Sequence, residues 1–111
     1  MRINYTYNAT VVRVVDGDTV ILKVDFGFRV FAESPFRLWG INCPEMSTPE
    51  GKLAKKRAEE LLPVGKEILA KTYKNPIDKY GRYLAELYVG TKNINQVLVK
   101  EGHAVSYMAI Q

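Results

Sequence analysis

The stretch that decides the fold is NATVVRVVDGDTVILKV, residues 8–24. Residues 8–15 are rich in Val and Thr, which predicts a β-strand. The Asp-Gly pair at residues 16–17 is a strong signal for a two-residue hairpin loop. Residues 19–24 then alternate between the two faces in the manner of a half-buried strand. We therefore predict two antiparallel strands joined by a tight turn.

A third strand is expected over residues 28–38, after a turn at residues 25–27. Pro35 lies within this segment and cannot donate a backbone hydrogen bond, which favours a bulge or an edge position for that part of the strand. Three strands joined by hairpins form a meander, and a curled meander is how a small barrel begins.

A helix is predicted to follow residue 48. Thr48 is the expected N-cap, Pro49 suits the first helical position, and Glu50 carries a favourable charge in the first turn. Pro63 and Gly65 should end the helix.

The rest of the chain predicts two more strands and a short helix. Residues 66–73 and 83–89 are the expected strands, with a loop over residues 74–78. Asn95 is expected to cap a short helix, with Ile94 and Val99 as an apolar pair on either side of the cap. The predicted class is mainly β with α, in one domain over residues 1–111. This is the layout of a five-stranded oligonucleotide/oligosaccharide-binding (OB) barrel with a helix between strands three and four.

Composition limits the function classes. The net charge of +4 and pI near 9.2 suit a polyanionic partner without requiring one. Cys43 and His103 are the only residues of their kinds, so an internal disulfide and a Cys/His metal site are excluded, while a Cys–His nucleophile pair is formally open. No apolar leader or membrane-spanning run is visible. We expect a cytoplasmic monomer with no membrane partner, or a secreted protein if a leader was removed.

The segment at residues 36–45 carries three chemically useful side chains. Arg37 can grip an anionic oxygen through two hydrogen bonds, Asn42 offers an oxygen to a hard cation, and Glu45 can take a proton from water. The alternative interpretation is a strand that ends in a turn with a surface Glu.

Two other turns could add to this site. Asp16 and Asp18 are two close carboxylates that a Ca²⁺ or Mg²⁺ ion would suit, although a hairpin also tolerates this sequence on conformational grounds alone. Lys79, Tyr80 and Arg82 could hold phosphate or stack on a base, or simply form a polar loop before a strand.

Three segments together resemble the signature segments of the staphylococcal nuclease (thermonuclease) family. They are VDGDTV at residues 15–20, FRL at 36–38 with PE at 44–45, and DKYGR at 78–82. NQVLVKEG at residues 95–102 also resembles that family's following short helix. The ordered set covers nearly the whole chain, which makes it more specific than any one motif. The resemblance implies a Ca²⁺-dependent endonuclease that hydrolyses phosphodiester bonds of DNA and RNA, prefers single strands and leaves 3′-phosphate ends.

The resemblance also implies roles for individual residues. Asp18 matches a calcium carboxylate, Asn42 the position of a second, Cys43 a main-chain carbonyl ligand, and Asp16 an outer carboxylate. The residues matching the catalytic positions are Arg37, Glu45 and Arg82. The residues matching nucleotide-holding positions are Lys79, Tyr80 and Tyr107.

Two departures from the family pattern affect these expectations. Asn42 removes one negative charge, so we expect weaker Ca²⁺ binding and reduced activity, with Mg²⁺ or another divalent ion as an alternative. The segment over residues 25–35 is longer than the family's equivalent.

The rival hypotheses are a nuclease-like barrel that binds single-stranded nucleic acid or a protein partner without cutting, and a structural interaction domain. Trp39 is expected in the core, and His103 is given no catalytic role.

Overall fold

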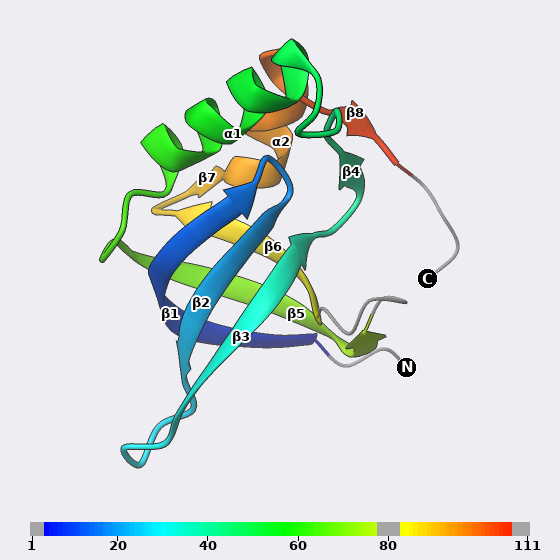
Figure 1. Cartoon of the computed structure of the whole chain (residues 1–111). Coiled ribbons are helices and arrows are strands. Elements are labelled where there is room, and N and C mark those ends of the chain that lie inside the picture. Colours follow the sequence, from blue (N-terminus) through cyan, green and yellow to red (C-terminus); the bar gives the residue numbers. More distant parts are fainter. Residues whose placement is uncertain (1–3, 78–82, 108–111) are drawn as a thin grey trace.

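Five long strands close into a barrel in the computed structural model, which describes residues 4–77 and 83–107 (Figure 1). These strands are β1 (Asn4–Asp16), β2 (Thr19–Asp25), β3 (Phe31–Leu38), β5 (Glu67–Ile77) and β6 (Tyr83–Val89). They are hydrogen-bonded in the order β3-β2-β1-β5-β6, and β3 then pairs in parallel with β6 to close the circle. The predicted α+β class with an OB-type barrel is confirmed.

The long strand β1 serves two neighbours because it bends. Its register with β2 shifts between Val11 and Arg13 and again between Val14 and Asp16. Such irregularities bend a strand and increase its twist, which lets β1 pair with β2 near its end and with β5 near its start. Pro35 lies just before the residues of β3 that pair with β6, in a stretch without a register shift. It therefore occupies an edge segment and not a bulge.

Two helices cover one end of the barrel, the upper end in Figure 1. In α1 (Pro49–Leu61) the buried positions include Ala54 and Ala58, and the Thr48 hydroxyl accepts the Gly51 N–H at 3.0 Å as predicted for the N-cap. In α2 (Ile94–Lys100) the buried side chains include Leu98. In the described part of the chain, neither helix has the length and apolar character needed to cross a bilayer.

Three short strands complete the part of the chain that the structure describes. β7 (Lys92–Asn93) extends the sheet beside β6, while β4 (Ile41–Asn42) pairs with β8 (Val105–Ser106) in a separate two-stranded sheet. This second pairing brings the C-terminal part of the described chain beside the segment that follows β3 (Figure 1).

The predicted strand boundaries need two corrections. β3 begins at Phe31 and not at residue 28, because residues 26–30 form the hairpin loop. β5 runs to Ile77, so most of the loop expected at residues 74–78 is strand. Ile77 lies opposite Tyr83 of β6, and this cross-strand pairing extends β5 beyond its apolar stretch.

The N-cap of α2 is Asn93 and not Asn95. The Asn93 side chain accepts the Gln96 N–H at 3.2 Å, which is the bond a cap makes. The Asn95 side chain is fully buried instead. The apolar pair expected at Ile94 and Val99 is wrong as a capping feature, because the cap lies two residues earlier.

Candidate functional site

Arg37 is the centre of the candidate site. Its Nη1 lies 2.8 Å from Oδ2 of Asp18, and its Nη2 donates to the Ile41 carbonyl at 3.0 Å and to Asn42 Oδ1 at 3.2 Å. The side chain is 14% exposed. These contacts engage three of the five N–H groups of a guanidinium, so the group is held in place with donors left for an anionic ligand.

The sheet register places Asp18 beside Arg37. Asp18 lies in the β1–β2 turn, and the next residue, Thr19, is directly opposite Arg37 in the β2–β3 pairing. The Cys43 N–H also donates to Asp18 Oδ2, at 3.0 Å. A Cβ on Gly17 would lie 2.9 Å from both Ala54 Cβ and Cys43 Sγ. The turn is therefore packed tightly between α1 and the segment after β4, and it needs glycine at this point.

The two carboxylates of the turn titrate in opposite directions. Burial and the neighbouring Asp18 raise the pKa of Asp16 above its ordinary value. Burial also opposes ionisation of Asp18, but it is outweighed by hydrogen bonds from Asp16, the Cys43 N–H and Arg37, so the pKa of Asp18 is lowered. The negative charge therefore stays on Asp18, and a proton taken up by the pair goes to Asp16.

The Cys43 thiol is not a nucleophile. Burial, followed by the negative charges of Asp18 and Asp16, raises its pKa to about 12. Cys43 and His103 line the same shallow depression, so the formal Cys–His pair does come near in space. A thiol with so high a pKa stays protonated at neutral pH, which removes the reactive form.

Glu45 lies on the loop that leaves the site, with its backbone fixed and its side chain exposed. Its carbonyl accepts hydrogen bonds from the Thr48 N–H at 3.0 Å and the Thr48 hydroxyl at 2.7 Å. A Cβ on Gly51 would lie 1.9 Å from that carbonyl oxygen, so only glycine lets α1 approach the loop this closely. The helix start thus sets the position of the candidate proton acceptor.

Tyr107 reaches the site through the β4–β8 pairing. Its N–H donates to the Gly40 carbonyl at 2.7 Å, and Arg37 Cζ lies 6.0 Å from the centre of its ring. The ring is exposed and could face a ligand that binds the guanidinium. The other predicted nucleotide and phosphate residues lie outside the described residues: Lys79, Tyr80 and Arg82.

The oxygen donors near Arg37 suit a hard cation. Asp16, Asp18, Asn42 and the Cys43 carbonyl offer only oxygen, the donor type that Ca²⁺ and Mg²⁺ prefer. Burial first, and then the neighbouring Asp18, raise the pKa of Asp16, and a bound cation would oppose both effects by favouring the ionised carboxylate. Within residues 4–77 and 83–107 no three acidic, His or Cys side chains form a metal-holding group. An ion here would rest on two carboxylates and neutral oxygens, which limits its affinity.

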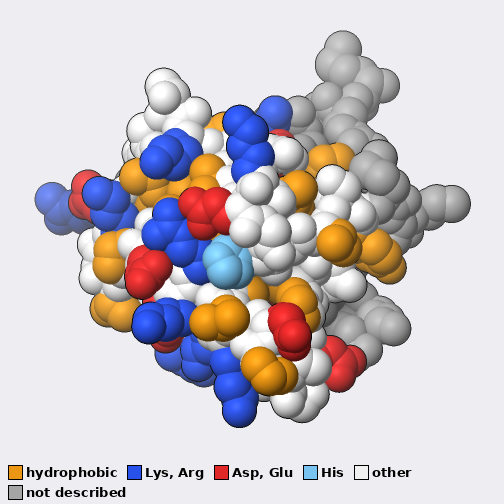
Figure 2. Space-filling view, turned by 90° about the horizontal axis from the view of Figure 1, so that it is seen from above, with side chains coloured by type: hydrophobic (Ala, Val, Ile, Leu, Met, Phe, Trp, Pro, Cys, Tyr) orange, Lys and Arg blue, Asp and Glu red, His pale blue; other side chains and the backbone are white. Residues whose placement is uncertain are grey.

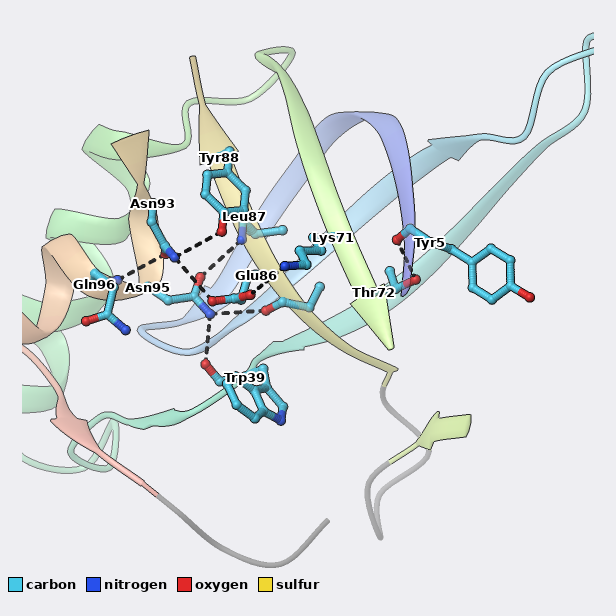
Figure 3. Close-up of polar contacts among 11 residues, drawn as sticks. Tyr5, Trp39, Lys71, Thr72, Glu86, Leu87, Tyr88, Asn93, Asn95 and Gln96 are labelled. Carbon is cyan, nitrogen blue, oxygen red and sulfur yellow. Dashed lines mark hydrogen bonds and ion pairs between the residues drawn. The ribbon is translucent and has the colours of Figure 1, made fainter. Parts of the chain in front are cut away.

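Asn95 is a residue that the sequence prediction misplaced. Its amide Nδ2 donates to the carbonyls of Trp39 at 2.9 Å and Ala85 at 3.1 Å, and its Oδ1 accepts the Leu87 N–H at 3.2 Å (Figure 3). It thereby fastens the Trp39 turn, which lies between Arg37 and Asn42, to β6. An Asn on the buried side of a helix, next to Ile94, was the available signal.

Trp39 itself is not in the buried core. Its side chain is only partly buried, contrary to the expectation from its place at a strand end. Its backbone ties the turn to β6 and α2, because its N–H donates to the Ala85 carbonyl at 2.9 Å and its carbonyl accepts the hydrogen bond from Asn95.

The helix end of the barrel carries mixed charges. Figure 2 shows Lys and Arg side chains interspersed with Asp and Glu on this face. Arg57 of α1 holds both carboxylate oxygens of Glu101, at 2.6 and 2.9 Å, and Glu60 at 3.2 Å. This face is therefore not a uniform cationic surface for a polyanion.

Comparison with known proteins is consistent with this geometry. The family model described as "Staphylococcal nuclease homologue" matches residues 35–111. Endonuclease YncB of Bacillus subtilis is 36% identical over 108 residues, covering 91% of this chain and 49% of that protein. The SPbeta prophage-derived endonuclease YokF of the same organism is 38% identical, covering 91% of this chain and 35% of its own length. The thermonuclease of Staphylococcus intermedius is 34% identical, covering 83% and 55%. The chain thus spans between about a third and just over half of these relatives.

Proposed function

The chain belongs to the staphylococcal nuclease homologue family, and from this premise we propose that it is a metal-dependent endonuclease. The proposed reaction is hydrolysis of phosphodiester bonds in DNA and RNA, with a preference for single strands and with 3′-phosphate products. The observation that carries the proposal is the anchored guanidinium of Arg37, 2.8 Å from Asp18 beside a second carboxylate.

The candidate residues divide the chemistry between them. Arg37 binds the phosphate oxygens and stabilises the negative charge that builds up on them as water attacks phosphorus. Glu45 takes the proton from that water. A new P–O bond forms, the bond to the 5′ oxygen breaks, and that oxygen is protonated from solvent. Arg82 is the proposed second phosphate ligand, and Lys79, Tyr80 and Tyr107 are proposed to hold the nucleotide.

Asp16, Asp18, Asn42 and the Cys43 carbonyl would hold the ion, Ca²⁺ in the first instance with Mg²⁺ as an alternative. A divalent ion at this position would supply Lewis-acid stabilisation of the phosphate charge. Arg37 already neutralises part of the charge on Asp18. Since Asn42 is uncharged, we propose weak ion binding and reduced activity.

A second candidate function is a barrel that binds single-stranded nucleic acid or a protein without cutting. Asn42 favours it, because this side chain is uncharged and the described residues hold no group of three acidic, His or Cys side chains for an ion. The largely buried ion pair between Arg37 and Asp18 favours the enzyme, because it fixes a guanidinium in the position where the proposed reaction needs a ligand for the phosphate.

The test is cleavage of single-stranded DNA and RNA with Ca²⁺, with Mg²⁺ and with chelator, for the wild type and Glu45→Gln. We expect cleavage that needs the ion and is lost in Glu45→Gln. Retarded migration without cleavage, unchanged in Glu45→Gln, would support the binding module. Asn42→Asp should tighten Ca²⁺ binding, and unchanged affinity would remove Asn42 from the ion site.

A further inference from the structure

The β2–β3 hairpin ends in an exposed aromatic tip, defined here as residues 26–31. Figure 1 shows the tip extending beyond the barrel, at the end opposite the helices. Phe28 is 99% exposed, and Phe26, Val30 and Phe31 are each about half exposed. Water hydrates this much apolar surface unfavourably, and clustered exposed apolar residues commonly mark a binding surface.

Phe31 lies on the same face of β3 as Arg37. Side chains alternate along a strand, so positions 31, 33, 35 and 37 point to one side. Phe36 and Leu38 are buried in the barrel, which places Arg37 and its set on the outer side. Phe31, Glu33 and Pro35 are exposed and Arg37 is partly exposed, so this side of β3 leads from the tip to the candidate site.

Lys23 of β2 adds a cation to this surface. It lies opposite Glu33 in the pairing of β2 with β3, and its Nζ is 4.7 Å from the centre of the Phe31 ring. Arg29 adds a second cation within the tip itself. Aromatic rings interleaved with cations are the side chains that bind single-stranded nucleic acid without sequence preference.

We propose that the aromatic tip, through Phe28 and Phe31 with Lys23, binds the bases and backbone of a single-stranded nucleic acid whose other part lies at Arg37. This inference rests on the proposed function for the identity of the ligand. Phe28 and Phe31 stack on bases, and Lys23 faces the backbone. The hairpin becomes a second contact that favours long strands over short ones.

The spacing sets the length of strand required. Arg37 and Phe31 are six residues apart along β3, or about 20 Å at about 3.3 Å per residue. A strand with stacked bases advances about 3.4 Å per nucleotide, so about six nucleotides cover the distance. Oligonucleotides of about three nucleotides should not reach both places.

The charges near the tip explain why stacking has to supply most of the binding. Asp25 and Glu33 offset Lys23 and Arg29, and Asp25 also accepts the Gly27 N–H at 2.8 Å. Ionic attraction at the tip is therefore weak. Glu33 lies between the two contact points and should repel the strand that spans them.

The test measures binding of fluorescent oligothymidylates of about 20 and about 3 nucleotides in chelator, so that no cleavage is needed. For the double variant Phe28→Ala/Phe31→Ala we expect the affinity for the long strand to fall by about tenfold to hundredfold. The affinity for the short strand should change less than about twofold. Glu33→Gln should tighten binding of the long strand only.

Phe26→Ala is the matched control. Phe26 is in the same tip and is also about half exposed, but its ring packs 5.1 Å from that of Tyr7, which packs against the core. It is therefore expected to leave the long-strand affinity unchanged. Circular dichroism and thermal unfolding verify that each variant is folded.

Three results would overturn the inference. The first is an unchanged affinity of the double variant for the long strand, and the second is an equal loss of affinity for both lengths. The third is a double variant that loses binding to phosphatidylcholine/phosphatidylserine vesicles but keeps its affinity for the long strand, which would assign the tip to a lipid surface. The proposed hydrolysis can fail independently of this inference. Length-dependent binding that needs Phe28 and Phe31 would still support the inference if the protein cleaved nothing.

Discussion

The two ends of the β2–β3 hairpin differ in what surrounds them. At the barrel end, Arg37 is held by Asp18, Ile41 and Asn42, and α1 packs against the neighbouring turn. At the free end, Phe28 is almost completely exposed and the backbone of Phe28 and Arg29 is left-handed. The same pair of strands thus carries a charged group in fixed contacts and apolar groups in water. Neighbouring elements, and not the strands themselves, decide how tightly a side chain is positioned.

The largest expected effect comes from replacing the anchored arginine. Arg37→Lys should lower cleavage by about 10²- to 10³-fold, because an ammonium cannot keep the planar set of contacts while binding phosphate. Single-turnover cleavage with Ca²⁺ measures this. Arg57→Lys, which alters an exposed ion pair on the helices, is the control and should cut normally. Activity of Arg37→Lys within twofold of wild type would show that the anchoring has no catalytic value.

The next effect is on stability at the fixed end. Asn95→Ala removes the partners of the Leu87 N–H and of the Trp39 and Ala85 carbonyls, and should destabilise the fold by about 3 kcal/mol. Urea denaturation measures the change. Gln96→Ala, at the neighbouring exposed position, should cost less than about 0.5 kcal/mol. Equal costs for the two variants would mean that the Asn95 bonds do not hold the turn.

Substitutions at the two helix N-caps should distinguish a loss of stability from a loss of activity at the candidate site. Thr48→Ala and Asn93→Ala should each cost about 1 kcal/mol, because each removes an N-cap acceptor. Only Thr48→Ala should also lower cleavage, by about tenfold, since the Thr48 hydroxyl also holds the Glu45 carbonyl. Thermal unfolding and cleavage assays together measure this. A similar activity loss in both variants would trace it to stability alone.

The paired carboxylates predict a pH-dependent effect of Asp16→Asn. Because the folded-state pKa of Asp16 is raised, its ionised form opposes folding at neutral pH, and this penalty disappears as pH falls to its ordinary value of 3.8. Without divalent ion, Asp16→Asn should therefore raise the unfolding temperature at neutral pH but not below pH 3.8.

The ionised form of Asp18 has the opposite effect on stability, because it favours folding. Its pKa is lowered, so its stabilising contribution is present above its ordinary value and is lost as pH falls through the folded-state pKa. Added Ca²⁺ should stabilise the wild type more than Asp16→Asn. A pH series of thermal melts measures both effects. If Asp16→Asn were less stable than the wild type at neutral pH, the conclusion that the pair takes up its proton at Asp16 would be contradicted.

The smallest effect is expected at the free end. Phe28→Gly should change stability by less than about 0.5 kcal/mol, because relief of the left-handed backbone at φ 56° is offset by the greater freedom of glycine when unfolded. Urea denaturation measures this. A loss of several kcal/mol would show that Phe28 packs against the protein in solution.

Much of the barrel could be predicted because its signals are local. The alternation in residues 19–24 and the Asp-Gly turn specify a hairpin, and Thr48 with Pro49 specifies a helix start. The extension of β5 to Ile77 was not predictable in this way, because it follows from pairing with β6. Asn93 and Asn95 are equivalent as caps in the sequence. Burial against the Trp39 turn and β6 gives Asn95 its different place.

The candidate site was likewise predictable only in part from the sequence. The motifs predicted that Asp16, Asp18, Arg37 and Asn42 would come together, and the structure brings them together. They did not predict that Arg37 would be fixed by Asp18, or that Cys43 would donate to the same carboxylate oxygen. Those contacts join residues up to 25 positions apart, which no local pattern encodes. The catalytic and ion-binding roles stay predictions.

The sequence alone determined the residue types, the strand and helix signals and the family of this protein, because each is written in short stretches of chain. Only the tertiary structure decided which carboxylate Arg37 pairs with, which asparagine is buried, and which aromatic side chains remain exposed to water. Those outcomes depend on barrel closure and on the seating of α1, where residues distant in sequence compete for the same hydrogen bonds and the same space.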